Sequence, residues 1–324
     1  MKLKKHLLTV AIATGGISFL ASGQVFAEPG CAPSAHTQRL ACEFDLRDDF
    51  FTTSAQCLDV DNADAACFDE AELDYDDGLE ECGDVLEARL DLCESLDDAT
   101  HDPQFGPDFA ANFVDPLTIG AATTPNPWFA LVPGNTWVYE GDGETIEVVV
   151  TSDTKLIEGI TCIVVVDTAS EDGVVVEQTD DWYAQDVDGN VWYCGEISEN
   201  FEEIDGDDVS GPELVDIEGS WKAGRDRAEA GILLPFDPQV GEFSRQEFAQ
   251  TDAEDAIEIL ALDASETAPG GSCSGTCLMT RDFSPLEPGV EENKFYVPGV
   301  GLIVEIKPGT SERVELIEFT GVGQ

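Results

Sequence analysis

The chain has 324 residues, of which 68 are Asp or Glu and 15 are Lys or Arg, so its formal net charge at pH 7 is −53. Phosphate backbones and anionic lipids are repelled by a surface of this sign, which argues against a protein that binds nucleic acid or a lipid surface. Self-repulsion at this charge favours a soluble monomer, and the charge is compatible with a salty medium or with divalent cations.

The first 27 residues have the pattern of a secretory signal peptide. Three lysines precede a short apolar stretch, and residues 25–27 (VFA) resemble the small-residue site at which such peptides are cleaved. The apolar stretch contains Gly15, Gly16 and Ser18, so it would span a bilayer poorly. We therefore expect residues 1–27 to be removed, the mature protein to be periplasmic or extracellular, and no membrane span to remain.

Residues 28–100 are predicted to form an α-helical hairpin. This segment is acidic, contains Ala and Leu throughout, and has its only prolines at Pro29 and Pro33, so its interior lacks turn signals. We predict helices at about 34–58 and 64–97 from this pattern. A three-helix arrangement, broken near Gly78 and Gly83, is the alternative.

The six cysteines of this segment have a palindromic spacing of 11, 15, 10, 15 and 11 residues. In an antiparallel hairpin, residues that face each other have a nearly constant sum of sequence numbers, and the nested cysteine pairs all share one sum. Steps of 11 and 15 residues rotate by about 20° and 60° on an α-helix, so the three cysteines of each helix lie on one face. Exported proteins form disulfides, and the spacing predicts three nested ones: Cys31–Cys93, Cys42–Cys82 and Cys57–Cys67.

The acidic stretch at the centre of this palindrome is predicted to be the bend of the hairpin. It does not fit a calcium-binding EF-hand loop, because Ala63 and Asp64 stand where that loop needs Asp or Asn and then Gly. Asp61 or Asn62 would instead cap the second helix at its N-terminus.

Residues 101–127 are rich in Pro, Gly, Ala and Thr and are predicted to be a linker. From residue 128 to 324, short β-branched runs alternate with turn signals such as Asp142-Gly143 and Asp172-Gly173. Strands at this spacing predict an antiparallel β meander, closed as a barrel or folded as a sandwich. The segment DAEDAIEILAL, residues 252–262, fits either a helix or the end of a strand.

Histidine is almost absent after residue 27, where only His36 and His101 remain, and both precede the predicted β domain. This argues against a Ser-His-Asp or Cys-His catalytic site and against a histidine-bound zinc. The sequence contains no phosphate-binding loop, nucleophile elbow or dinucleotide-binding fingerprint. Carboxylates are so abundant that the sequence does not locate a catalytic pair among them.

The stretch DVDGN, which begins at Asp186, is the best candidate for a calcium site, because calcium binds oxygen donors. It fails as an EF-hand loop, since Gly189 stands at position 4 and Ile197 at position 12. A hairpin turn at Asp188-Gly189 is the simpler interpretation. Asp186, Asp188 and Asn190 are the candidate metal ligands. No cofactor is expected, although these residues leave calcium as a possible ligand.

Basic residues are concentrated in one stretch of the predicted β domain, where Lys222, Arg225, Arg227 and Arg245 lie within 24 residues. Arginine forks beside Trp221 would suit an anion or a carbohydrate. Trp221, Arg225, Arg227 and Arg245 are therefore the candidate ligand residues. The alternative is that these side chains pair with the carboxylates around them.

Aromatic residues are frequent in the predicted strands. We expect them to form the core of the barrel or sandwich rather than a platform for a sugar. They are Trp128, Trp137, Tyr139, Trp182, Tyr183, Trp192 and Tyr193.

Several motifs between residues 126 and 306 together resemble a family of bacterial exported proteins and lipoproteins. They are NPWFALVPGNTWVYEG, DWYAQDVDGNVWYCGE, GSWKAG with AGILLP, and PLEPGVEENKFYVPGVGLIVE. The resemblance implies a β domain and an exported location, and it implies no activity. The four cysteines of the β region allow three pairings. The resemblance implies a pair like Cys162–Cys277, which leaves Cys194–Cys273 as the second pair.

These observations predict a mainly β protein, with an antiparallel β meander over residues 128–324 after a disulfide-stapled helical hairpin over residues 28–100. Our first hypothesis for its function is an exported, non-catalytic binding or interaction protein whose partner is a protein, a glycan or a cation. The first alternative is a secreted carboxylate-dependent carbohydrate hydrolase or lyase. The second alternative is a protein that binds calcium.

Overall fold

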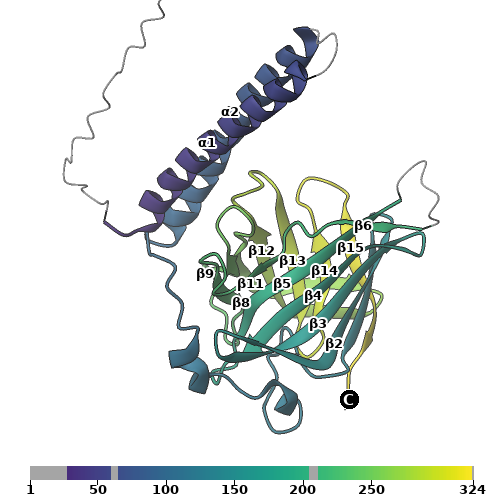
Figure 1. Ribbon diagram of the computed structural model, residues 1–324. Coiled ribbons are helices and arrows are strands. Elements are labelled where there is room, and N and C mark those ends of the chain that lie inside the picture. Colours follow the sequence, from purple (N-terminus) through teal and green to yellow (C-terminus); the bar gives the residue numbers. More distant parts are fainter. Residues whose placement is uncertain (1–27, 60–64, 204–210, 323–324) are drawn as a thin grey trace, which may run out of the picture.

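The chain is described by a computed structural model over residues 28–59, 65–203 and 211–322. The predicted signal peptide, residues 1–27, and the centre of the predicted bend, residues 60–64, lie outside the described residues. A pair of long helices stands beside a strongly curved antiparallel sheet (Figure 1). The protein is therefore mainly β with an N-terminal helical pair, as the sequence predicts.

The helical pair, which we call the arm, consists of α1 (Cys31–Leu58) and α2 (Ala65–Ser95), close to the predicted bounds. The three nested disulfides predicted from the cysteine spacing are confirmed. The Cα–Cα distances are 5.4 Å for Cys31–Cys93, 6.1 Å for Cys42–Cys82 and 5.9 Å for Cys57–Cys67.

The two helices of the arm are held close together by cross-links and small residues rather than by a large core. Helix axes usually lie about 8–10 Å apart, and a disulfide needs Cα atoms within about 7 Å. Gly78 permits this approach, because a Cβ there would overlap the side chain of Leu46 in α1. Helix α2 continues through Gly78 and Gly83, so the three-helix alternative is wrong. Phe44 and Phe51 remain more than 60% exposed.

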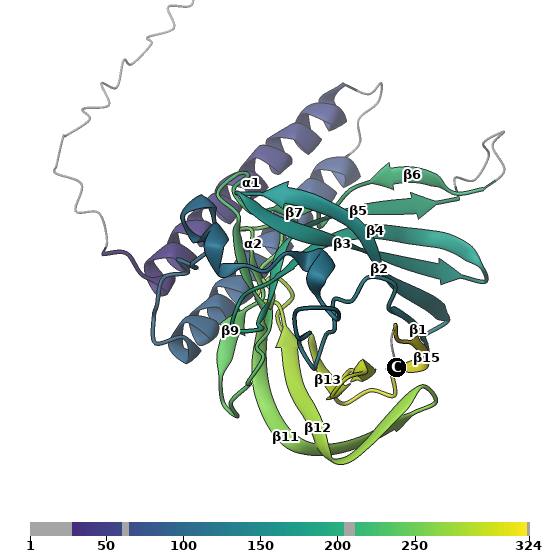
Figure 2. The ribbon, with the colours of Figure 1, turned by 90° about the horizontal axis from the view of Figure 1, so that it is seen from below.

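Fifteen strands of the described residues form one antiparallel sheet, which curls into a nearly closed barrel (Figure 2). The sheet order is β10-β8-β5-β4-β3-β2-β1-β15-β14-β13-β12-β11-β9, with β6 and β7 paired to β5. The strands are β1 (Thr136–Gly141), β2 (Glu144–Ile157), β3 (Ile160–Glu171), β4 (Val174–Gln185), β5 (Val191–Glu202), β6 (Glu213–Asp216), β7 (Trp221–Lys222), β8 (Glu229–Leu234), β9 (Phe243–Arg245), β10 (Glu247–Phe248), β11 (Ala256–Ala268), β12 (Gly271–Phe283), β13 (Glu291–Val297), β14 (Gly301–Ile306) and β15 (Arg313–Thr320). The segment that fitted either a helix or a strand end leads into β11, so its second half is a strand.

Two of the predicted turns connect long neighbouring strands of the barrel. Asp142 and Gly143 join β1 to β2, and Asp172 and Gly173 join β3 to β4. All four residues have positive φ, between 49° and 96°. This is the requirement of a two-residue type I′ turn, whose twist matches that of the strands that it joins.

The two ends of the sheet meet where the chain passes from β9 to β10. Strand β8 lies against this crossing at Gly231, where a Cβ would overlap the backbone of Arg245 and Gln246. Only glycine therefore allows the two backbones to approach this closely. The contact brings the edges of the sheet together and makes the architecture a barrel rather than a sandwich.

The segment predicted as a linker, residues 101–127, packs against the barrel. It contains two short 3-10 helices, η1 (Pro107–Asn112) and η2 (Pro116–Thr118), and it crosses the end of the barrel that faces the viewer in Figure 2. Ile119 is only 2% exposed, and Phe113 meets the ring of Trp192 with centroids 5.7 Å apart. The segment joins the arm to β1 and also covers part of the barrel.

The base of the arm is fixed to the barrel by a buried ion pair. Arg89 of α2 donates to both carboxylate oxygens of Glu254, over 2.7 Å and 2.9 Å. Arg89 is 3% exposed and Glu254 is not exposed at all. Gln38 of α1 also donates to Glu254, over 3.4 Å. The remainder of the arm extends away from the barrel (Figure 1).

The cysteines of the β region pair differently from the prediction. Cys273 is bonded to Cys277 in the same strand, and Cys162 and Cys194 are buried thiols. Strand β12 bulges around Gly275, which has a φ of 69°, and this brings the two Cα atoms within 5.6 Å.

The predicted pairs Cys162–Cys277 and Cys194–Cys273 are therefore corrected. Five strands separate β3, which carries Cys162, from β12, which carries Cys277, along the sheet. Cys194 lies beside Cys162 instead. Burial and this neighbouring thiol raise the pKa of Cys194 well above its ordinary value.

Neither α1 nor α2 is apolar enough to cross a membrane, and the described residues contain no other helix of sufficient length.

Candidate binding cavity

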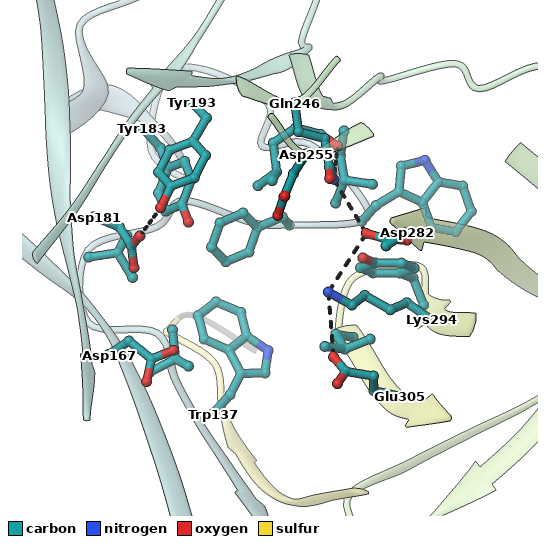
Figure 3. Close-up of a pocket in the computed structure, with 18 of the residues that line it drawn as sticks. Trp137, Asp167, Asp181, Tyr183, Tyr193, Gln246, Asp255, Asp282, Lys294 and Glu305 are labelled. Carbon is teal, nitrogen blue, oxygen red and sulfur yellow. Dashed lines mark hydrogen bonds and ion pairs between the residues drawn. The ribbon is translucent and has the colours of Figure 1, made fainter. Parts of the chain in front are cut away.

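The barrel encloses a cavity of about 330 Å³ (Figure 3). Alternate residues of a strand point to opposite faces of a sheet, so a curved sheet directs every second side chain inward. On β3 these are Val165 and Asp167, and on β4 they are Asp181 and Tyr183. The sequence thus builds the wall of the cavity from apolar, aromatic and acidic residues at alternate positions.

Aromatic rings form a large part of the wall. Tyr183 and Tyr193 are stacked with centroids 4.7 Å apart, and Phe129 meets the edge of Tyr183 at 5.3 Å. Trp137 packs against Phe129 at 5.6 Å. Such packing fixes the rings, so their faces and edges are presented to the cavity in a defined geometry.

Six of the seven expected aromatics belong to the buried core, as predicted, and five of the seven line the cavity. Trp182 and Trp192 do not line it; the five that do are Trp128, Trp137, Tyr139, Tyr183 and Tyr193. Trp182 carries the ammonium of Lys155 over its ring, 3.2 Å from the centroid. Which alternate positions of a strand face inward decides which aromatic residues line the cavity, and strand propensity does not reveal this.

One acidic group of the wall is built around Tyr193. Its hydroxyl lies 2.5 Å from a carboxylate oxygen of Asp181 and 2.6 Å from one of Glu196. The register between β4 and β5 slips by one residue at Cys194, so that Tyr193 and Glu196 both reach Asp181.

A phenol has one proton to donate, so this group holds a further proton on a carboxyl. Burial raises the pKa of Asp181 to about 6, although Tyr193 lowers it. Burial and the charge of Asp181 raise the pKa of Glu196 to about 8. The group is therefore at least partly protonated at neutral pH.

Across the cavity, Lys294 forms a second charged group (Figure 3). Its ammonium lies 3.7 Å from Asp282, 3.3 Å from Glu292 and 3.4 Å from Glu305. Burial lowers the pKa of Lys294, but these carboxylates outweigh burial and raise it well above its ordinary value. The ammonium is thus charged and is already matched by acidic partners.

The remaining acids of the wall form no ion pair with the described residues. Asp167, Glu247 and Asp255 all line the cavity. Burial, with the charge of Asp181, raises the pKa of Asp167 to about 8. Glu247 is 5% exposed and its Oε2 accepts no hydrogen bond; Trp221 Nε1 is near enough to lower its pKa but is itself unpaired.

The wall as a whole therefore has a strong excess of acid. Of the described residues, six carboxylic acids and one lysine line the cavity. Burial is the first cause of the raised pKa of most of these acids, because the carboxylate loses water inside the barrel. The cavity offers a polar, proton-rich and aromatic environment to a small molecule.

The predicted calcium ligands form a turn. Asp186 accepts hydrogen bonds on Oδ1 from the amides of Asp188 and Asn190, and on Oδ2 from the side chains of Asn190 and Trp192. These donors lie 2.9–3.0 Å away and occupy both oxygens. Only Gly189 of the predicted turn pair has a positive φ, so the turn is a longer loop rather than a type I′ turn.

A metal centre is not preformed elsewhere in the described residues. They contain no group of three or more His, Cys, Asp or Glu side chains placed to hold a metal ion. The oxygens of Asp186 serve the backbone of the loop, which is the usual use of an aspartate in a turn.

The predicted ligand residues divide between two surface depressions. Trp221 and Arg225 line one of about 490 Å³, and Arg227 and Arg245 line another of about 270 Å³. Arg225 is 75% exposed at its side chain and pairs with Asp226. Arg245 is 6% exposed and lies over the ring of Phe248, 4.3 Å from the centroid. The structure does not bring the four residues together as one site.

Histidine does not complete a catalytic group with these residues. His101 lies in the segment that covers the barrel, with Nε2 2.9 Å from the carbonyl oxygen of Ala230. Burial lowers its pKa to about 4, so it is neutral at physiological pH. It serves as a hydrogen-bonding contact between this segment and the barrel.

Comparison of the chain with family models, curated proteins and solved structures gave no match. The resemblance to exported proteins and lipoproteins stays an expectation from the sequence motifs.

Proposed function

We propose that the protein is an exported binding protein that holds a small organic molecule inside its barrel. The observation that carries this proposal is the cavity of about 330 Å³, walled by packed aromatic rings and buried polar groups. Ligand sites are typically about 300–1,000 Å³ in volume and combine apolar walls with a few placed polar groups. The disulfides of the arm favour an exported location.

Two unpaired polar atoms of the wall support the same proposal. Glu247 Oε2 and Trp128 Nε1 are both buried, and neither makes a hydrogen bond of normal geometry with the described residues. Buried polar groups are nearly always hydrogen-bonded in native proteins. A bound molecule would supply the missing partners.

The carboxyl pair bridged by Tyr193 does not fit the hydrolase alternative. Asp181 and Glu196 are joined through the hydroxyl of Tyr193, which stands between them. A retaining glycosidase needs the space between its two carboxyls for the scissile bond. A phenol fills that space here, so binding is the better-supported function.

The test is a titration with the neutral dye N-phenyl-1-naphthylamine, whose fluorescence rises in apolar surroundings. We expect saturable binding at one site. Val165→Trp should weaken it at least about tenfold by filling the cavity, since Val165 lines the cavity and is fully buried.

Leu156→Trp is the matched control, because Leu156 is 71% exposed, and it should leave dye binding unchanged. Circular dichroism verifies that both variants fold. Absence of saturable binding, or undiminished binding to a folded Val165→Trp variant, would overturn the proposal.

A further inference from the structure

We infer that the molecule held in the barrel is an organic cation, with an ammonium group that enters between the acidic and aromatic residues of the β3–β4 wall. This inference rests on the proposed binding function and names its ligand class. The relevant side of the cavity is the one opposite Lys294, where Asp167 and Asp181 lie in Figure 3.

Charge is distributed unevenly across the cavity. Among the described residues, Lys294 supplies the one ammonium of the wall, which is shared by Asp282, Glu292 and Glu305. Asp167 and Asp181 take part in no ion pair of the described residues. Without a counter-ion these buried acids favour the protonated, neutral form, and a cationic ligand would stabilise the carboxylate form instead.

One buried carboxyl oxygen of the wall makes no hydrogen bond of normal geometry with the described residues. Glu247 is 5% exposed, lines the cavity, and has no hydrogen bond to Oε2. It stands near Asp181 and Asp255, whose charges act on it. In its carboxylate form Glu247 would accept a hydrogen bond from a donor on the ligand.

Aromatic rings line the cavity beside these acids. Tyr183, Tyr193 and Trp137 line the cavity together with these acids. The face of an aromatic ring attracts a cation, more strongly when water is excluded. Rings and carboxylates combined on one wall select for positive charge on a carbon skeleton.

A bare metal ion fits this wall less well than an organic cation. Metal sites bring several oxygen donors to about 2.0–2.6 Å from one point. The described residues have no three acidic side chains so arranged, and the cavity of about 330 Å³ has room for a molecule of organic size.

Calorimetry with three probes of one carbon skeleton tests the inference at fixed ionic strength. The probes are 3-phenylpropylamine, which is cationic, 3-phenylpropanol, which is neutral, and 3-phenylpropionate, which is anionic. We expect the amine to bind at least about tenfold more tightly than the alcohol, and the carboxylate to show no binding.

Asp181→Asn and Asp180→Asn provide a matched pair of variants. Asp181 lines the cavity and its neighbour on β4, Asp180, does not. Asp181→Asn should reduce the preference for the amine over the alcohol, while saturable binding of the neutral dye shows that the cavity is intact. Asp180→Asn should preserve the preference.

The outcomes separate this inference from the proposed function. If the alcohol binds as tightly as the amine, or if the neutral dye enters and no amine displaces it, the inference is wrong and the binding function stands. Displacement of the amine by calcium at equal ionic strength would assign the acids to a metal instead. If neither the dye nor any probe binds, the proposed function itself is wrong.

Discussion

The arm and the barrel use the same acidic composition in opposite ways. In the arm, no Asp or Glu of either helix is buried, while Phe44, Phe51 and Leu58 are exposed and the disulfides occupy the interior. In the barrel, carboxyls such as Asp181 and Glu247 are buried beside aromatic rings. The number of acidic residues therefore does not determine whether their side chains are buried. Their positions along the helix or strand, which decide the face that each side chain takes, determine it.

The difference extends to what stabilises each part. The arm has few buried apolar side chains, so its stability depends on covalent cross-links that restrict the unfolded chain. The barrel has a continuous core that includes Leu131, Val150 and Ile303, all fully buried. If the two parts are stabilised separately, the arm can unfold while the barrel stays folded.

The largest effect is expected from reduction of the disulfides. Each contributes about 2–4 kcal/mol, so loss of all three should melt the arm at room temperature. Far-ultraviolet circular dichroism should lose its helical signal under reductant. The fluorescence of the five tryptophans, which all lie between residues 128 and 221, should retain its native emission.

Two double variants locate this effect. Cys42→Ser with Cys82→Ser removes the middle cross-link of the arm and should lower its melting temperature. Cys273→Ser with Cys277→Ser removes the cross-link within β12 and should leave the helical transition unchanged. Joint loss of the helical and tryptophan signals under reductant would show that the arm and the barrel are one cooperative unit.

The next effect concerns the contact between the two parts. Arg89→Met leaves the buried carboxylate of Glu254 without its main partner, and breaking a buried ion pair typically costs about 3–5 kcal/mol. Chemical denaturation should show this loss. Arg225→Met is the control, because the pair Arg225–Asp226 is exposed and should contribute less than about 1 kcal/mol. Equal losses in the two variants would contradict the buried contact.

The effect that is smallest per pH unit is a change of the stability of the barrel with pH. The pKa values of Asp167 and Glu196 are about 8 in the folded protein and about 4 in an unfolded chain. Between these values the folded state binds more protons, so its stability should fall as pH rises from 5 to 8. Each such acid contributes a slope of about 1.4 kcal/mol per pH unit.

Asp167→Asn should remove the share of this slope that belongs to Asp167. The free energy of unfolding, measured by tryptophan fluorescence in denaturant at several pH values, gives the slope for both proteins. A stability that rises between pH 5 and pH 8, or an unchanged slope in Asp167→Asn, would contradict the buried acids.

The arm could be predicted from the sequence because the spacing of its cysteines alone specifies how the two helices pair. Six cysteines with a constant index sum leave one hairpin register, and the helical period places them on one face. The turns at Asp142-Gly143 and Asp172-Gly173 were predictable for the same reason, since only a few residues tolerate positive φ.

The cavity could not be predicted, because acids occur on both faces of the strands. Asp180 and Asp181 are adjacent in the sequence, and only the inward phase of β4 distinguishes them. The alternation of Asp181 with Tyr183 was a usable signal, but the slip at Cys194 that brings in Glu196 was not. The bulge that pairs Cys273 with Cys277 likewise depends on a backbone irregularity that spacing does not record.

The nested cross-links of the arm also constrain how the length of the arm can change. One residue inserted between Cys42 and Cys57 would rotate Cys57 by about 100° relative to Cys42 on α1. Cys82 and Cys67 on α2 could then no longer both face their partners. A residue inserted at the matching distance from the bend in α2 would restore the register. Natural variants of this protein should therefore gain or lose length in α1 and α2 together, or in the bend itself.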